Sequence, residues 1–153
     1  MADVSNMEDV LDSRDVIARF EEMESEREDL FLELEGAKDG SLGEDATRLA
    51  EATAALAEWD ELNGEELKAL TDFLEELKGN GGDEQWRGDW YPVTLVRESY
   101  WRDYAQEYAE DVGDPTMRDA GWPYNCIDWD QAARELRIDY TCSDFDGVTY
   151  WYR

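Results

Sequence analysis

The chain has 153 residues, of which 42% are hydrophobic and 12% aromatic, so it carries enough apolar material for a core and lacks the aromatic-poor composition of a disordered protein. Its 41 acidic and 14 basic residues give a formal net charge of −27, which disfavours nucleic acid and anionic membranes as partners and favours a basic protein surface. It contains no histidine, which excludes Ser-His-Asp and Cys-His catalytic sites.

The sequence also lacks the common motifs for binding nucleotides and metal ions. No glycine-rich phosphate loop with a following Lys-Ser/Thr is present. The DFDG stretch at residues 144–147 lacks the further ligands of an EF-hand loop, so we interpret it as a turn. Cys126 and Cys142 allow one disulfide or two thiols, and we expect two buried thiols in a reduced environment. We therefore expect a protein that is not an enzyme and that binds neither a metal nor a cofactor.

The N-terminal stretch MADVSNMEDVL has neither the cationic start nor the apolar run of a targeting signal. No segment approaches the roughly 20 apolar residues of a membrane span. We expect a soluble protein in the cytoplasm, without a membrane partner.

Composition changes within KGNGGDEQ, residues 78–85. All eight tyrosines and six of the seven tryptophans follow this glycine-rich stretch, which is a plausible boundary. We predict an acidic helical segment over residues 1–80 and an aromatic-rich acidic α+β domain over residues 83–153. The fold class expected for the whole chain is α+β, predominantly helical.

In the first segment, apolar residues at alternating steps of four and three predict a helix with Ser13 as its N-cap and Gly36 as its stop. This spacing is typical of a coiled-coil seam, in which Arg27 would fix the register or pair with an acid of a facing helix. We expect the seam to form a helix–helix contact or a homodimer interface. It consists of Val16, Phe20, Met23, Arg27, Leu30 and Leu34.

Two more helices are predicted at residues 44–62 and 65–78, separated by a stop at Asn63–Gly64. The residues expected to face inward are Leu49, Thr53, Leu56 and Trp59 in the first helix and Leu67, Leu70, Phe73, Leu74 and Leu77 in the second.

The second segment begins with a β-prone stretch, residues 91–96, and continues into a helix that Gly113 ends. On this helix Trp101, Ala105, Tyr108 and Val112 share one stripe. Acids on the opposite stripe repel one another by roughly 0.2–0.5 kcal/mol per pair, so this arrangement costs stability and calls for a functional explanation. These acids are Asp103, Glu107, Glu110, Asp111 and Asp114.

The chain ends with a predicted helix and a predicted hairpin. Asp128, three residues before Gln131, gives a capping-box-like start to a helix over residues 128–137. Its inward positions are Trp129, Ala132, Ala133 and Leu136. Alternation in residues 148–152 after the FDG turn predicts a strand that pairs with residues 140–143 in a small antiparallel sheet.

Negative charge at this density matches that of nucleic acid. Duplex DNA carries one charge per about 1.7 Å of axis, so a net charge of −27 corresponds to a duplex about 46 Å long. Acids one helical turn apart are separated by about 5.4 Å of rise, which flexible carboxylates can adapt to the spacing of phosphates. Such a mimic would bind by charge pairing and would lose affinity as salt rises.

Residues from about 95 to 153 resemble the C-terminal part of the ArdA antirestriction family and of related short phage proteins. The matching features are YAQEYAEDVG, the WP loop, IDWDQAARELRIDY and the terminal DGVTYWYR. Members of that family are acidic, usually dimeric DNA mimics that inhibit type I restriction enzymes, and residues 1–82 have no counterpart in the family's preceding domains. The resemblance implies a phage antirestriction protein that inhibits host defence in the host cytoplasm, whose partner is a DNA-binding defence complex with a basic groove. Because residues 1–82 depart from the family, a CRISPR effector stays open as the target, which would make the chain an anti-CRISPR protein. The partner-binding face that it implies consists of Asp103, Glu107, Glu110, Asp111, Asp114, Asp128, Asp130, Glu135 and Asp139.

Alternative interpretations stay open. A non-enzymatic acidic adaptor or structural phage protein would bind through apolar contacts of the Phe20–Leu34 seam. A salt-adapted protein would carry the same excess of acids and would unfold in dilute buffer. An enzyme would need paired carboxylates in a shared site.

Overall fold

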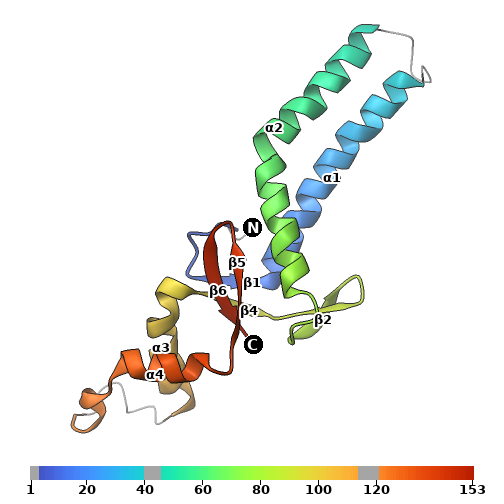
Figure 1. The fold of residues 1–153 in the computed structure, drawn as a ribbon. Coiled ribbons are helices and arrows are strands. Elements are labelled where there is room, and N and C mark those ends of the chain that lie inside the picture. Colours follow the sequence, from blue (N-terminus) through green and yellow to red (C-terminus); the bar gives the residue numbers. More distant parts are fainter. Residues whose placement is uncertain (1–3, 40–45, 114–120) are drawn as a thin grey trace. The chain divides into compact units, whose positions relative to one another are not determined.

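The structure is a computed structural model that describes residues 4–39, 46–113 and 121–153 (Figure 1). The chain divides into two compact units. Val16–Glu75 forms a helical unit, and Met1–Asp15 together with Glu76–Arg153 forms a mixed unit. The fold is α+β and predominantly helical, which confirms the predicted class. None of the described helices is long and apolar enough to cross a membrane.

The helical unit is an antiparallel hairpin of α1 (Ser13–Lys38) and α2 (Ala46–Leu77) (Figure 1). Ion pairs join the two helices at increasing sequence separations. Arg48 of α2 pairs with Glu33, which is 15 residues away, and Arg19 pairs with Glu66, which is 47 residues away. This progression is the register of an antiparallel pair.

The predicted stop at Asn63–Gly64 is wrong, because α2 is continuous through it. The Asn63 amide donates to the Trp59 carbonyl oxygen at 3.2 Å, a bond within the helix. Contacts with α1 hold α2 on both sides of this point, at Asp60 and at Glu66. Tertiary packing therefore overrides the low helix propensity of the Asn-Gly pair.

Both predicted ends of α1 also differ from the structure. Asp12, rather than Ser13, caps the helix, since Asp12 Oδ1 accepts the Arg14 N–H at 2.9 Å. At the other end, α1 continues past Gly36 to Lys38. In α2, Thr53 is exposed and its hydroxyl donates to the Leu49 carbonyl oxygen, so the expectation that Thr53 faces inward is wrong.

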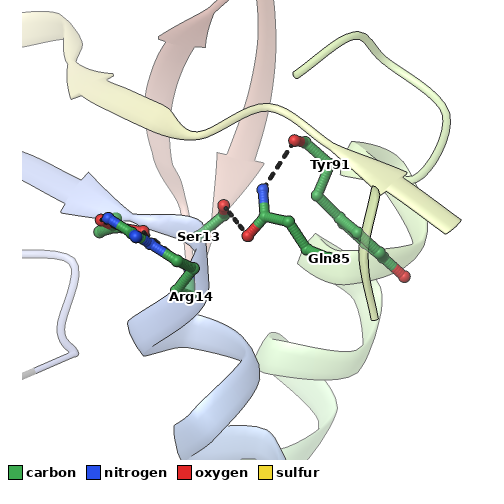
Figure 2. A network of polar contacts seen from close by, with 5 residues as sticks. Ser13, Arg14, Gln85 and Tyr91 are labelled. Atoms are coloured by element: carbon green, nitrogen blue, oxygen red, sulfur yellow. Dashed lines mark hydrogen bonds and ion pairs between the residues drawn. The ribbon is translucent and has the colours of Figure 1, made fainter. Parts of the chain in front are cut away.

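Ser13 has a different role, which Figure 2 shows. It is fully buried, and its hydroxyl donates to Gln85 Oε1 at 3.1 Å. The Gln85 amide in turn donates to the Tyr91 carbonyl oxygen at 2.9 Å. One glutamine thus links the start of α1 to a small hairpin of β2 (Asp83–Trp86) and β3 (Asp89–Tyr91).

The mixed unit is built on a four-stranded antiparallel sheet in the order β1-β4-β6-β5. Its strands are β1 (Val10–Asp12), β4 (Thr94–Arg97), β5 (Thr141–Phe145) and β6 (Val148–Tyr152). The predicted C-terminal hairpin is confirmed, with Asp146 and Gly147 at positive φ in its two-residue turn. The predicted strand at 91–96 is interrupted, because Tyr91 ends β3 and β4 begins at Thr94.

The N-terminal strand was not predicted, and it places the start of the chain with the C-terminal half. Val10 of β1 pairs with Val96 of β4. The Tyr150 hydroxyl donates to the Glu8 carbonyl oxygen at 2.7 Å. Residues 4–12 therefore belong to the mixed unit, whereas the composition of the sequence changes only near residue 80.

Two helices pack beside the sheet of the mixed unit. They are α3 (Trp101–Val112) and α4 (Trp129–Arg137). A short 3-10 turn, η1 (Glu98–Tyr100), precedes α3. A second 3-10 turn, η3 (Tyr124–Cys126), precedes α4. Trp101 is 3% exposed, and its indole N–H donates to the Ala133 carbonyl oxygen at 2.8 Å. Val112 is 66% exposed, so the predicted apolar stripe does not reach the end of α3.

Candidate functional site

The outer side of α3 carries a row of carboxylates. Asp103, Glu107 and Asp111 are exposed, and Glu110 is half-buried. Successive members of the row at steps of four residues are separated by about 6 Å along the helix axis. Tyr100, Asp103, Gln106, Glu107 and Glu110 line a shallow hollow of about 370 Å³. Four of the five residues of the predicted acidic stripe therefore lie on one surface of α3, namely Asp103, Glu107, Glu110 and Asp111.

Neutral side chains orient two of these carboxylates. The Tyr100 hydroxyl donates to Glu107 Oε1 at 2.6 Å. This hydrogen bond raises the pKa of Tyr100 to about 12, because the phenolate that would replace the hydroxyl loses the bond and is repelled by the carboxylate. The Gln106 amide donates to Glu110 Oε1 at 3.4 Å. Both contacts order a carboxylate and leave its negative charge in place.

Three carboxylates of this row have no cation close to them in the described part of the chain. Among the described residues, no Lys or Arg lies within 4.0 Å of Asp103, Glu107 or Asp111. The one cation of α3, Arg102, instead pairs with Asp130 of α4 at 2.8 Å. These three carboxylates therefore have no ion-pair partner among the residues that the structure describes.

The acids of α4 have other contacts. Asp128 caps the helix by accepting the Gln131 N–H at 3.1 Å, which confirms the predicted cap. Asp130 pairs with Arg102, and Glu135 accepts the Gln131 amide at 3.0 Å. Asp139 is exposed. None of these four lines the α3 hollow, and Asp114 lies outside the described residues.

The predicted seam lies within the helical unit. Val16, Phe20, Met23 and Leu34 are buried, and Leu30 is half-buried. Arg27 Nε donates to Asp60 Oδ1 of α2 at 2.8 Å. The seam therefore faces α2 of the same chain at Arg27. The interhelical partner expected for Arg27 is thus an acid of the same chain.

The two cysteines are free and exposed, so the expectation of buried thiols is wrong. Cys142 lies on β5, an edge strand of the sheet, and Cys126 lies in η3. Over the described part of the chain, no group of three or more Cys, Asp or Glu side chains is arranged to hold a metal ion.

Sequence reasoning missed two residues of the acidic face, Tyr100 and Gln106. Tyr100 precedes Glu107 by seven residues, which is two helical turns and hence the same side of the helix. This spacing is the signal in the sequence that relates Tyr100 to the acidic row.

Comparison of the chain with family models, curated proteins and solved structures gives no match.

Proposed function

We propose that this protein is an acidic DNA mimic that inhibits a DNA-binding complex of bacterial defence by occupying its cationic groove. The complex would be a restriction enzyme or a CRISPR effector, and the protein would act in the cytoplasm of a phage-infected host. The proposal combines the resemblance of residues 95–153 to antirestriction proteins with the electrostatics of α3.

The observation that carries the proposal is the exposed acidic row Asp103, Glu107 and Asp111 on α3. These carboxylates are exposed and have no described cation within ion-pair distance. Like charges at these spacings destabilise a helix. An incoming row of Lys and Arg side chains would relieve that repulsion, so binding a cationic groove would remove a cost that the free protein carries.

The dimensions support the same interpretation. With 12 residues, α3 is about 18 Å long, which is the length of about five base pairs of duplex DNA. The helix backbone is already ordered, and hydrogen bonds from Tyr100 and Gln106 hold Glu107 and Glu110, which reduces the conformational entropy lost when these carboxylates meet the basic groove.

The test is a competition assay. A fluorescent duplex is bound to a purified type I restriction enzyme, or to a CRISPR effector, and the protein is titrated in at low salt. We expect displacement of the duplex, with an inhibition constant that weakens steeply between about 50 and about 200 mM salt.

A matched pair of triple variants locates the binding face. Asp103→Asn/Glu107→Gln/Asp111→Asn removes the α3 row, and Glu58→Gln/Glu61→Gln/Glu65→Gln removes the same amount of charge from exposed positions of α2. We expect at least about tenfold weaker inhibition for the first and less than about threefold for the second. Equal effects of the two triple variants would show that inhibition depends on net charge alone. If the protein competed with the duplex at low salt for neither a restriction enzyme nor a CRISPR effector, the proposal would be overturned.

A further inference from the structure

The helical unit contains an open groove of about 460 Å³ along the line where α1 meets α2. Its α1 side is formed by Phe20, Glu24, Arg27, Glu28 and Phe31, which lie on one face of that helix. Its α2 side includes Leu67. The groove lies wholly within Val16–Glu75 and shares no residue with the acidic row of α3.

The groove has an apolar base and an acidic rim. Phe20 is buried, Leu67 is half-buried, and Phe31 is 45% exposed. Glu24 and Glu28 lie between the two phenylalanines in the sequence, line the same groove and are exposed. A ligand that fits it needs an apolar group for the base and a positive group for the rim.

The cation that lines the groove is paired with an acid of α2. Arg27 donates from Nε to Asp60 Oδ1 at 2.8 Å and from Nη2 to Asp60 Oδ2 at 3.2 Å, so its guanidinium is already paired with a carboxylate of α2. All five cations of the unit are in ion pairs with acids of the same unit, namely Arg19, Arg27, Lys38, Arg48 and Lys68.

The net charge of the helical unit indicates which kind of ligand the groove can bind. Val16–Glu75 contains 19 acidic and 5 basic residues, a net charge of −14. A second copy of this hairpin would bring an equal negative charge to the same surface and would be repelled. A positively charged segment would be attracted over the distance of the Debye length.

We propose that this groove binds a basic amphipathic helix of a partner protein, with apolar side chains between Phe20, Phe31 and Leu67 and flanking Lys or Arg side chains on Glu24 and Glu28. This is the helix-in-groove mode of recognition, in which apolar anchors recur every three or four residues of the bound segment. The site is independent of the proposed DNA mimicry, which uses α3.

The probe is a synthetic peptide of about four helical turns with leucines along one face and lysines elsewhere. Its control is a scrambled peptide of identical composition that has no apolar face. Binding to the full chain is measured by calorimetry, and the site is located by amide chemical-shift changes in two-dimensional NMR. We expect the amphipathic peptide to bind at least about tenfold more tightly than the scrambled one, with shifts confined to the groove.

Neighbouring residues of α1 supply matched variants. Phe31→Ser removes a groove side chain, and Leu32→Ser removes an adjacent apolar side chain that is 58% exposed and does not line the groove. We expect about tenfold weaker binding for Phe31→Ser and less than about twofold for Leu32→Ser. Glu28→Gln should reduce the salt dependence of binding, whereas Asp29→Asn next to it should not.

Equal binding of the two peptides, or equal effects of the two serine variants, would overturn the proposal. A salt-stable dimer of the chain with amide chemical-shift changes in the groove would also overturn it, because the groove would then bind a second copy of the chain. The α3 triple variant should bind the amphipathic peptide as the unmodified chain does. Failure of this site and failure of the mimicry are therefore distinguishable.

Discussion

Arg27 of α1 and Asp60 of α2 form two parallel hydrogen bonds across the helical hairpin, from Nε to Oδ1 at 2.8 Å and from Nη2 to Oδ2 at 3.2 Å. This contact replaces an apolar pair at a seam position. The bidentate geometry fixes how the two helices align along their length, because a shift by one residue would separate the guanidinium from the carboxylate.

A double-mutant cycle measures this pair. The side chains are 43% and 42% exposed, so solvent screens the interaction and we expect a coupling energy of about 0.5–1 kcal/mol between Arg27→Ala and Asp60→Ala. Urea unfolding of the four proteins gives the value. The exposed Lys68–Asp72 pair within α2 is the control, with an expected coupling of at most about 0.5 kcal/mol. Equal couplings for the two pairs would contradict a special role for the interhelical contact.

The same pair contributes a pH dependence. The hydrogen bond from Arg27 lowers the pKa of Asp60 below its usual value. A lowered pKa means that the contribution to stability is present above the unfolded-state pKa of about 3.9 and is lost as pH falls through the folded-state pKa. The difference in unfolding free energy between the unmodified chain and Asp60→Asn should therefore shrink only at strongly acidic pH.

Glu107→Gln should stabilise the protein. Glu107 has like charges at Asp103, Glu110 and Asp111, and each such pair costs roughly 0.2–0.5 kcal/mol. Glutamine keeps an acceptor for the Tyr100 hydroxyl. We expect a gain of about 0.5–1 kcal/mol at low salt, which disappears in about 1 M salt as screening removes the repulsion. Glu65→Gln in α2, with Glu61 and Lys68 as its charged neighbours, should change stability by less than about 0.3 kcal/mol. A loss of stability in Glu107→Gln would show that the row carries no strain.

Gly64→Ala should stabilise α2. Gly64 lies inside the continuous helix, and an added Cβ would meet no atom within 4 Å. Alanine lowers the entropy of the unfolded chain and has the higher helix propensity, so we expect a gain of about 1 kcal/mol in thermal or urea unfolding. Gly82→Ala is the contrasting variant, because Gly82 has a φ of +73° and its added Cβ would lie 1.8 Å from the Tyr91 carbonyl oxygen. A gain in stability for Gly82→Ala or a loss for Gly64→Ala would contradict these backbone conformations.

Three tyrosines should titrate late. Burial raises the pKa of Tyr104 and of Tyr150 to about 12, and the hydrogen bond to Glu107 does the same for Tyr100. Because these values exceed the unfolded value of about 10, the stability that the protonated hydroxyls contribute is complete below pH 10 and is lost as pH rises toward 12. Ultraviolet difference absorbance follows the titration. Tyr100→Phe should remove one late-titrating group, and an unchanged late amplitude would contradict the assignment of Tyr100.

Part of the candidate site could be predicted from local spacing. The acidic row of α3 follows from the period of 3.6 residues per turn, and the Asp128 cap follows from the position of Gln131 three residues later. The partners of the α4 acids could not be predicted, because the pairing of Asp130 with Arg102 depends on how two helices pack. Cys142 is exposed whereas its neighbour Ser143 on β5 is buried, and which face of this strand is covered depends on tertiary packing.

The sequence by itself determined the net charge, which needs no structure. It also determined the C-terminal hairpin and the positions of α3 and α4, because these elements depend on residues that are close together in the chain. Only the tertiary structure decided that β1 pairs with β4, that Gln85 rather than a helix N–H binds the Ser13 hydroxyl, and that α2 passes through Asn63–Gly64 without stopping. Each of these depends on contacts between segments far apart in the chain, whose packing energy outweighs local preferences of a few tenths to about 1 kcal/mol per residue.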